Sequence, residues 1–271
     1  MWWLRQFFNF YIKASIHVAF AVVAFAFITS RFLNINLESH LVLFLFFGTI
    51  PAYNFIKYGA AAKKYLYLKN TYQKRIQLFS FLCAAFGLYF SAKLSWETWK
   101  GICFLGILVM LYAIPLIPDK RNLRNLGILK IIMVSLVWTG TTVLLPVLEG
   151  GLTFSRDLFV LFLQRFILIL VLMIPFEIRD LQTDPGALHT IPQRIGVRNT
   201  RLLGALLSLV FFLLSFLKDS LNSLEITMNT LITVSLVVLM ILTPKRQTTY
   251  FASFWVESFP IFWAGILVIL R

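Results

Sequence analysis

The sequence predicts an all-helical integral membrane protein with nine transmembrane helices and its N-terminus in the cytoplasm. Three observations support this fold class. Hydrophobic residues make up 59% of the 271 residues and charged residues only 13%, whereas soluble domains carry about 25% charged residues. The mean hydropathy is +0.83. Lysine and arginine also gather in every second connection between apolar segments, which is the charge pattern of multi-pass membrane proteins.

The chain divides into apolar segments that are each long enough to cross a hydrocarbon core of about 30 Å. Residues 1–12 precede the first segment and are rich in Trp and Phe, so we expect them to lie in the membrane interface. No stretch remains for a soluble domain, and residues 1–271 therefore form a single membrane domain. The predicted spans are residues 14–33, 41–58, 76–92, 101–118, 126–147, 157–176, 202–217, 224–242 and 250–270.

The distribution of charge predicts the orientation of these spans. With the N-terminus inside and the C-terminus outside, most basic residues lie on the cytoplasmic side and most acidic residues lie outside. The net charge of +14 is then explained by topology and by anionic membrane lipid, and we expect no nucleic-acid partner. This pattern predicts a multi-pass protein of the cell inner (cytoplasmic) membrane.

One acidic cluster opposes this charge trend. The stretch "FEIRDLQTDPG" places Glu177, Asp180 and Asp184 on the basic cytoplasmic side, at the end of the sixth predicted span. If the helix continues through residue 184, the three carboxylates share one helix face. Carboxylate oxygens suit Mg²⁺, which bridges protein carboxylates to substrate phosphates. The alternative is a solvated helix end whose acids pair with neighbouring arginines.

The residues after the cluster favour the metal-site interpretation. They read "DPGALHTIPQRIGVRNTR" and lead into the next apolar segment. This arrangement resembles the second signature of the UbiA superfamily of intramembrane prenyltransferases. In that family D-x-x-D-x-x-x-D ends the sixth of nine helices, and G-x-x-T-x-P-x-x-x-G follows. The matching residues are Glu177, Asp180, Asp184, Gly186, Thr190 (one position later than in the pattern), Pro192 and Gly196.

The resemblance implies a helical bundle around a central cavity and a membrane prenyltransferase activity. A prenyl group would pass from a prenyl diphosphate to an aromatic or lipid acceptor, with Mg²⁺ held by Asp180, Asp184 and Glu177. Asn54 and Tyr58 would face Asp180 across the cavity. The candidate substrate-binding residues are Asn54, Tyr58, Lys57, Lys120 and Arg121.

The first signature of the family, N-x-x-x-D-x-x-x-D, is degenerate in this chain. Asn54 keeps the first position, but Tyr58 and Ala62 replace the two aspartates, and no Asp or Glu lies between Glu38 and Glu97. A nearby lysine such as Lys57 could supply positive charge in place of the missing metal, or could simply belong to the cytoplasmic basic belt. The alternative function is therefore a catalytically impaired relative that binds an isoprenoid or a partner without turnover.

Overall fold

A computed structural model describes residues 2–59, 71–113, 127–220 and 222–269, and it contains helices and no strand over these ranges. The predicted all-helical class is confirmed. The helices are α1 (Trp2–Lys13), α2 (Ile16–Phe32), α3 (Ser39–Asn54), α4 (Thr71–Ser91), α5 (Trp96–Ala113), α6 (Ile128–Thr139), α7 (Leu145–Glu149), α8 (Arg156–Asp180), α9 (Ile191–Leu213), α10 (Ser223–Leu242) and α11 (Phe259–Ile269). Short π-helical or 3₁₀ turns extend several of them, at Phe55–Gly59, Gly140–Leu144, Gly186–Leu188, Leu214–Leu217 and Phe251–Val256.

Seven helical stretches of the described chain are long and apolar enough to cross a membrane, in agreement with a multi-pass membrane protein. An eighth arises if α1 and α2 count as one span bent by 54°. Helix α4 is not apolar enough over the length of a span to be counted with them, because Lys74, Arg75 and Gln77 lie in its first two described turns. The count of nine spans and the N-in, C-out orientation stay predictions.

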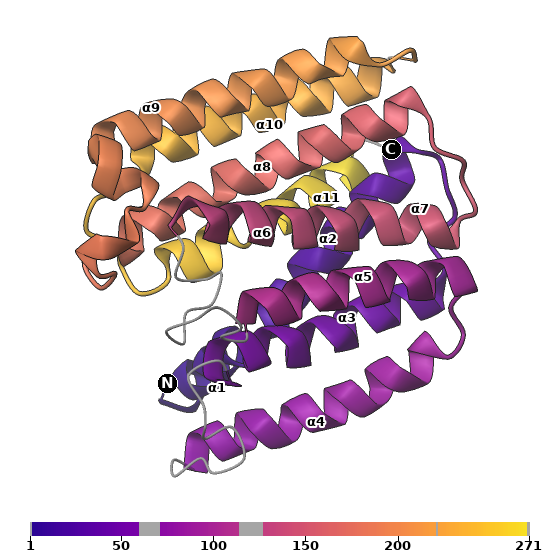
Figure 1. The fold of residues 1–271 in the computed structure, drawn as a ribbon, viewed down its shortest axis with the longest axis horizontal. Coiled ribbons are helices and arrows are strands. Elements are labelled where there is room, and N and C mark those ends of the chain that lie inside the picture. The colour runs from indigo at the N-terminus through magenta and orange to yellow at the C-terminus, as the bar shows by residue number, and fades with distance from the viewer. Residues whose placement is uncertain (1, 60–70, 114–126, 221, 270–271) are drawn as a thin grey trace.

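Helix α8 lies at the centre of the bundle and packs against α6, α9 and α10 (Figure 1). Its apolar residues form the largest buried cluster together with Phe25 of α2, Met240 of α10 and Trp263 of α11. Arg165 of α8 is also buried there, with its guanidinium 4.0 Å from the centroid of the Phe25 ring. A side chain that is both cationic and stacked on an aromatic ring can be accommodated in such a core.

Helices α3 and α4 form a second close pair on the other side of the molecule (Figure 1). Gly87 of α4 faces Gly48 of α3, and a Cβ atom placed on Gly87 would lie 3.4 Å from the Gly48 backbone nitrogen. Small residues at this position let the two backbones approach, as is common between membrane helices. Since α4 packs mainly on α3, this contact holds it in the bundle.

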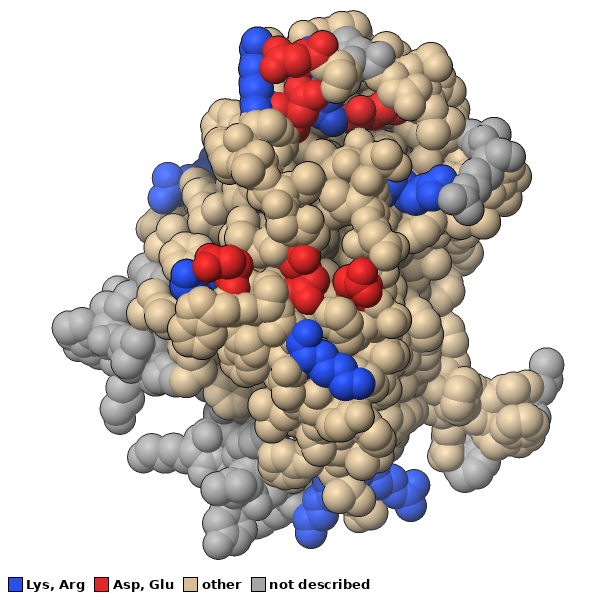
Figure 2. Space-filling model, turned by 90° about the vertical axis from the view of Figure 1, so that its right-hand side faces the viewer, with Lys and Arg blue, Asp and Glu red and all other residues tan. Residues whose placement is uncertain are grey.

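Carboxylates gather at one end of the bundle, which Figure 2 shows face-on. Several of them are held by specific partners: Glu149 accepts a hydrogen bond from the Ser95 backbone N–H and pairs with His40, and Asp219 pairs with Arg156. The acidic cluster at the end of α8 lies at the opposite end of that helix from Asp157. The cluster Glu177, Asp180 and Asp184, which stands apart from these acids in the sequence, is therefore also separated from them in the folded bundle.

The contact between Gly48 and Gly87 predicts a site of steric sensitivity. We expect Gly87→Val to destabilise the protein by roughly 1–3 kcal/mol, because the added methyl groups would push α4 away from the α3 backbone. Thermal unfolding in detergent measures this change. Gly106→Val is the matched control, since a Cβ atom there meets nothing within 4 Å. Equal melting temperatures for the two variants would contradict the packing described.

Candidate functional site

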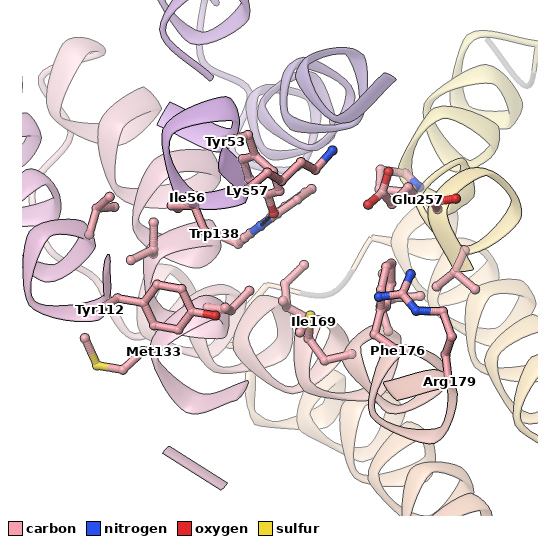
Figure 3. A pocket seen from close by; sticks show the side chains of 18 residues that line it. Tyr53, Ile56, Lys57, Tyr112, Met133, Trp138, Ile169, Phe176, Arg179 and Glu257 are labelled. Carbon is pink, nitrogen blue, oxygen red and sulfur yellow. Dashed lines mark hydrogen bonds between the residues drawn. The ribbon is translucent and has the colours of Figure 1, made fainter. Parts of the chain in front are cut away.

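A cavity of about 260 Å³ lies between α3, α5, α6, α8 and the segment that leads into α11 (Figure 3). Most of its wall is apolar or aromatic. Tyr53 and Trp138 stand against each other on one side, where Trp138 Nε1 donates a hydrogen bond of 2.6 Å to the Tyr53 hydroxyl. Tyr112 and Met133 lie toward the end away from Arg179. Such a concave, mostly apolar site with a few polar groups is typical of small-molecule pockets.

The charged groups of the cavity wall are Lys57, Arg179 and Glu257, and Figure 3 shows them around one end of it. Lys57 lies in the π-helical turn after α3, and Glu257 directly follows the π-helical turn Phe251–Val256. π-Helical turns within helices are rare and occur frequently at functional sites. Both turns therefore direct a charged side chain toward a chamber that is otherwise apolar.

Contacts with neighbouring residues orient the two cations. Lys57 Nζ donates a hydrogen bond of 3.0 Å to Ser15 Oγ, and Ser15 lies at the bend between α1 and α2 with a φ of 61°. The Arg179 guanidinium lies 5.1 Å from the centroid of the Phe176 ring, and its Nε donates a hydrogen bond of 2.7 Å to Asp180 Oδ1. Both cations are thus fixed by the protein and need little reorganisation to meet an anion.

Glu257 is the acidic group of this cavity. Among the residues that the structure describes, no hydrogen bond or ion pair reaches its carboxylate. A carboxylate in an apolar chamber is costly without a partner, and Figure 3 shows it facing the cavity. The polar end therefore offers two positive groups and one hydrogen-bond acceptor to a bound molecule.

The acidic cluster predicted from the sequence lies beside this cavity and is paired with cations of the protein. Glu177 is buried, and its Oε1 lies 2.7 Å from Lys130 Nζ of α6. The same ammonium lies 3.4 Å from Asp184 Oδ2, while Asp180 pairs with Arg179. None of the three acids is among the residues that line the cavity.

This arrangement differs from one continuous helical face of carboxylates. Helix α8 ends at Asp180, and Asp184 lies in the following turn, where its backbone N–H bonds to the Asp180 carbonyl at 2.8 Å. The expected continuation of the helix through residue 184 is wrong. The physical reason is Pro185, because the residue before a proline is disfavoured in the helical region.

The described side chains, as they are arranged, do not fit a bound Mg²⁺. Mg²⁺ requires oxygen ligands at about 2.0–2.1 Å in octahedral geometry, but Lys130 contacts two of the three carboxylates and Arg179 the third. In the described ranges, no group of three His, Cys, Asp or Glu side chains could hold a metal ion.

The structure places the remaining predicted site residues as follows. Asn54 is fully buried: its Nδ2 donates to Ser80 Oγ at 2.8 Å and to the Ala14 carbonyl at 3.1 Å, and its Oδ1 accepts from Ser15. The Tyr58 hydroxyl donates to the Lys13 carbonyl at 3.1 Å. Neither residue lines the cavity, whereas Lys57 does. Lys120, Arg121 and Ala62 lie outside the described residues.

The other residues of the second signature shape the chain after the acids. Thr190 precedes α9 and its N–H bonds to Gln193 Oε1 at 2.9 Å, while Pro192 lies in the first turn of α9. Gly196 interrupts α9 with a φ of 77°, a conformation in which glycine is favoured. Gln193 Nε2 also donates to the Pro185 carbonyl at 3.1 Å and so holds the turn that carries Asp184.

Comparison with solved structures identifies the fold. A UbiA homologue from Archaeoglobus fulgidus bound to GPP and Mg²⁺ superposes with a TM-score of 0.61 at 12% sequence identity, covering 96% of this chain and 99% of the other. The chain has a UbiA-like fold. The same homologue bound to DMAPP and Mg²⁺ gives a TM-score of 0.61 at 13% identity, covering 94% of this chain and 99% of that one. The Cd²⁺-bound form gives a TM-score of 0.63 at 14% identity, covering 93% of this chain and 97% of the other.

No protein-family model matches the chain, and no curated protein sequence matches it. The predicted resemblance to the UbiA superfamily is confirmed at the level of the fold. A likeness at this low identity carries no information about which residues act, so the roles of the acids and of Asn54, Tyr58 and Lys57 stay proposals.

Sequence reasoning did not single out Glu257, Arg179 or Lys130 as site residues. The sequence could have indicated Glu257, because an ionisable residue inside an apolar span commonly faces an interior site. Nothing in the sequence distinguishes Lys130 and Arg179, since each is one of many basic residues on the side predicted to be cytoplasmic. Their importance depends on partners that come from other helices.

The position of Asn54 predicts a structural effect. We expect Asn54→Ala to lower the free energy of unfolding by about 1–3 kcal/mol, because Ser15 and Ser80 lose a buried hydrogen-bond partner. Thermal unfolding in detergent tests this, with the exposed Asn199→Ala as control. An Asn54→Ala variant that keeps the wild-type melting temperature would contradict the network described.

Proposed function

We propose that the protein is a UbiA-like membrane prenyltransferase that binds a prenyl diphosphate in the cavity and transfers the prenyl group to an aromatic or lipid acceptor. One observation carries the proposal: Lys57 and Arg179 lie, beside Glu257, at one end of a cavity whose other walls are mostly apolar and aromatic. This division matches an amphiphile with an anionic head and a hydrocarbon tail. The ligands of the homologous structures, GPP and DMAPP, belong to this chemical class.

The diphosphate would lie between Lys57 and Arg179. A guanidinium binds phosphate oxygens through two parallel hydrogen bonds, and an ammonium adds a compact charge. In a chamber of low dielectric constant these charges act more strongly than in water. They would stabilise the negative charge that develops on the diphosphate when the bond from its oxygen to the first prenyl carbon breaks.

The remaining cavity groups would serve the prenyl chain and the acceptor. The faces of Tyr53, Trp138 and Phe176 can stabilise the allylic cation, because aromatic rings attract cations over their faces. The acceptor then forms a bond to the first prenyl carbon, and the proton that it loses would pass to the Glu257 carboxylate. Glu257 suits this role because it faces the cavity, and no hydrogen bond or ion pair from the described chain reaches its carboxylate.

The divalent ion predicted at Glu177, Asp180 and Asp184 is not required for these steps. The residues of this chain supply the positive charge of the cavity themselves, through Lys57 and Arg179.

A second candidate function is binding of an isoprenoid without turnover. It is favoured by the pairing of all three motif acids with Lys130 and Arg179, which leaves no described carboxylate of the motif open to a ligand-bound ion. Release of diphosphate in the presence of candidate acceptors separates the two functions, because only the transferase releases it.

The proposed head-group site predicts which substitutions weaken binding. We expect Arg179→Gln and Lys57→Met each to weaken binding of a non-hydrolysable prenyl diphosphate analogue by about 10- to 100-fold, as the loss of one charge-assisted contact implies. Titration of the purified protein in detergent measures the dissociation constants. Arg198→Gln removes an exposed charge of α9 outside the cavity and is the matched control. Equal affinities for all variants would exclude this cavity as the diphosphate site.

The apolar end of the cavity predicts a change in ligand preference. Tyr112 lines the wall far from Arg179, so Tyr112→Ala lengthens the space available to the tail. We expect the variant to bind analogues one isoprene unit longer more tightly relative to the wild type, by about tenfold or less. Competition between analogues of different length measures this ratio, and an unchanged ratio would place the tail elsewhere.

A further inference from the structure

Lys130 forms a buried cluster with two of the three acids of the second signature. Its ammonium lies 2.7 Å from Glu177 Oε1 and 3.4 Å from Asp184 Oδ2. Lys130 comes from the first turn of α6, Glu177 from the last turn of α8, and Asp184 from the turn that follows. The cluster therefore joins three separate segments through one cation.

Burial makes this cation necessary. Glu177 is 1% exposed and Lys130 is 9% exposed. An isolated carboxylate at this depth would be strongly destabilising, and an opposite charge in contact is the usual compensation. Within the described ranges, Lys130 is the cation in contact with Glu177, and Glu177 Oε2 has no hydrogen-bond partner. The charge of the ammonium is thus what keeps the two carboxylates together.

The backbone holds Lys130 in this place. Gly127 immediately precedes α6 with a φ of 50°, and a Cβ atom there would clash with the Leu188 carbonyl oxygen. The start of α6 is therefore pressed against the turn after the acids. Lys130 follows one helical turn later, where its backbone N–H bonds to the Gly127 carbonyl at 3.2 Å. Its side chain then reaches the carboxylates from a fixed position.

We propose that the ammonium of Lys130 is a built-in replacement for a divalent metal ion at the acidic signature. A metal ion that bound Glu177 and Asp184 would have to displace a covalently attached cation from both of them. The ammonium also cannot leave for water easily, because its stem is buried beside α8. The wild-type protein therefore has no divalent-ion site at these acids. This inference concerns the cluster alone and does not rest on the ligand of the cavity.

The inference predicts a gain of function when the charge of Lys130 is removed. In Lys130→Met the two carboxylates lose their shared cation while the unbranched stem is kept. Two adjacent carboxylates that repel each other, one of them with an unpartnered oxygen, are a preferred environment for an oxygen-binding divalent ion. We expect Lys130→Met to acquire one Mn²⁺ site per chain with a dissociation constant at least about tenfold lower than any site of the wild type.

The experiment is a titration of purified protein with Mn²⁺. Binding is measured as the decrease in the electron paramagnetic resonance signal of the free ion. Lys130→Met should bind one ion, and Lys130→Met combined with Glu177→Gln should lose it. Lys218→Met is the matched control, because the buried Lys218 forms an ion pair with a single carboxylate of the described chain, that of Glu225. It leaves one carboxylate rather than two and should bind no ion. Lys130→Arg keeps the charge and should also bind none.

Two results would overturn the inference. One is a folded Lys130→Met variant, judged by size-exclusion chromatography, that gains no Mn²⁺ site. The other result needs no variant of Lys130. If the wild-type protein binds one Mn²⁺ per chain and the Glu177→Gln variant does not, the wild type already binds a metal ion at these acids. The wild-type titration decides the question even if Lys130→Met does not fold.

Discussion

The buried ion pair between Lys130 and Glu177 determines how the end of α8 is built. An ionised carboxylate that is 1% exposed is costly unless an opposite charge contacts it, and here Lys130 of α6 supplies that charge. Gly127 meets this requirement by allowing α6 to begin against the 3₁₀ turn Gly186–Leu188 that follows the acids. The requirement also explains why Glu177 and Asp184 turn toward α6 and do not line the cavity.

The same orientation of α8 decides what the cavity presents to a ligand. With Glu177 facing Lys130, the neighbouring residues Phe176 and Arg179 face the cavity. The wall that α8 contributes at this point is therefore cationic and aromatic, while the acidic group of the cavity, Glu257, comes from the segment that leads into α11. Together with Lys57 the α8 wall can receive an anionic head group directly, through charges that are fixed by Ser15 and Asp180. A UbiA-like fold can in this way enclose a cavity with a cationic and aromatic wall in a chain whose first acidic signature is degenerate.

Much of the fold could be predicted from the sequence, because lipid imposes long apolar segments and a charge bias on each connection. The helix at residues 156–180 follows from an almost uncharged apolar run, and Thr190, Pro192 and Gly196 have local backbone roles that their types suggest. The span predicted at residues 76–92 lies within α4, whose described part runs from Thr71 to Ser91, since a helix can continue into the polar flank of an apolar span. Such ends depend on tertiary contacts.

The candidate site could be predicted only in part. Lys57 was expected near the substrate and lines the cavity. The polar side-chain atoms of Asn54 and Tyr58 instead bond to α1, to the bend between α1 and α2, and to α4. The spacing of Asn54 and Lys57 in the sequence cannot reveal this, because the neighbouring helices determine which side of a helix faces the cavity and which side is packed. For the same reason the role of Lys130 depends on Gly127 and on a turn about sixty residues later in the chain.

The most direct test is the structure of the protein in lipid nanodiscs, determined by electron cryo-microscopy with a non-hydrolysable prenyl diphosphate analogue and Mg²⁺. We expect the diphosphate between Lys57 and Arg179, the tail against Trp138, and Lys130 still in contact with Glu177. A diphosphate held by metal ions on Asp180 and Asp184, with the Lys130 ammonium displaced from Glu177, would contradict a cavity whose positive charge comes from the protein itself.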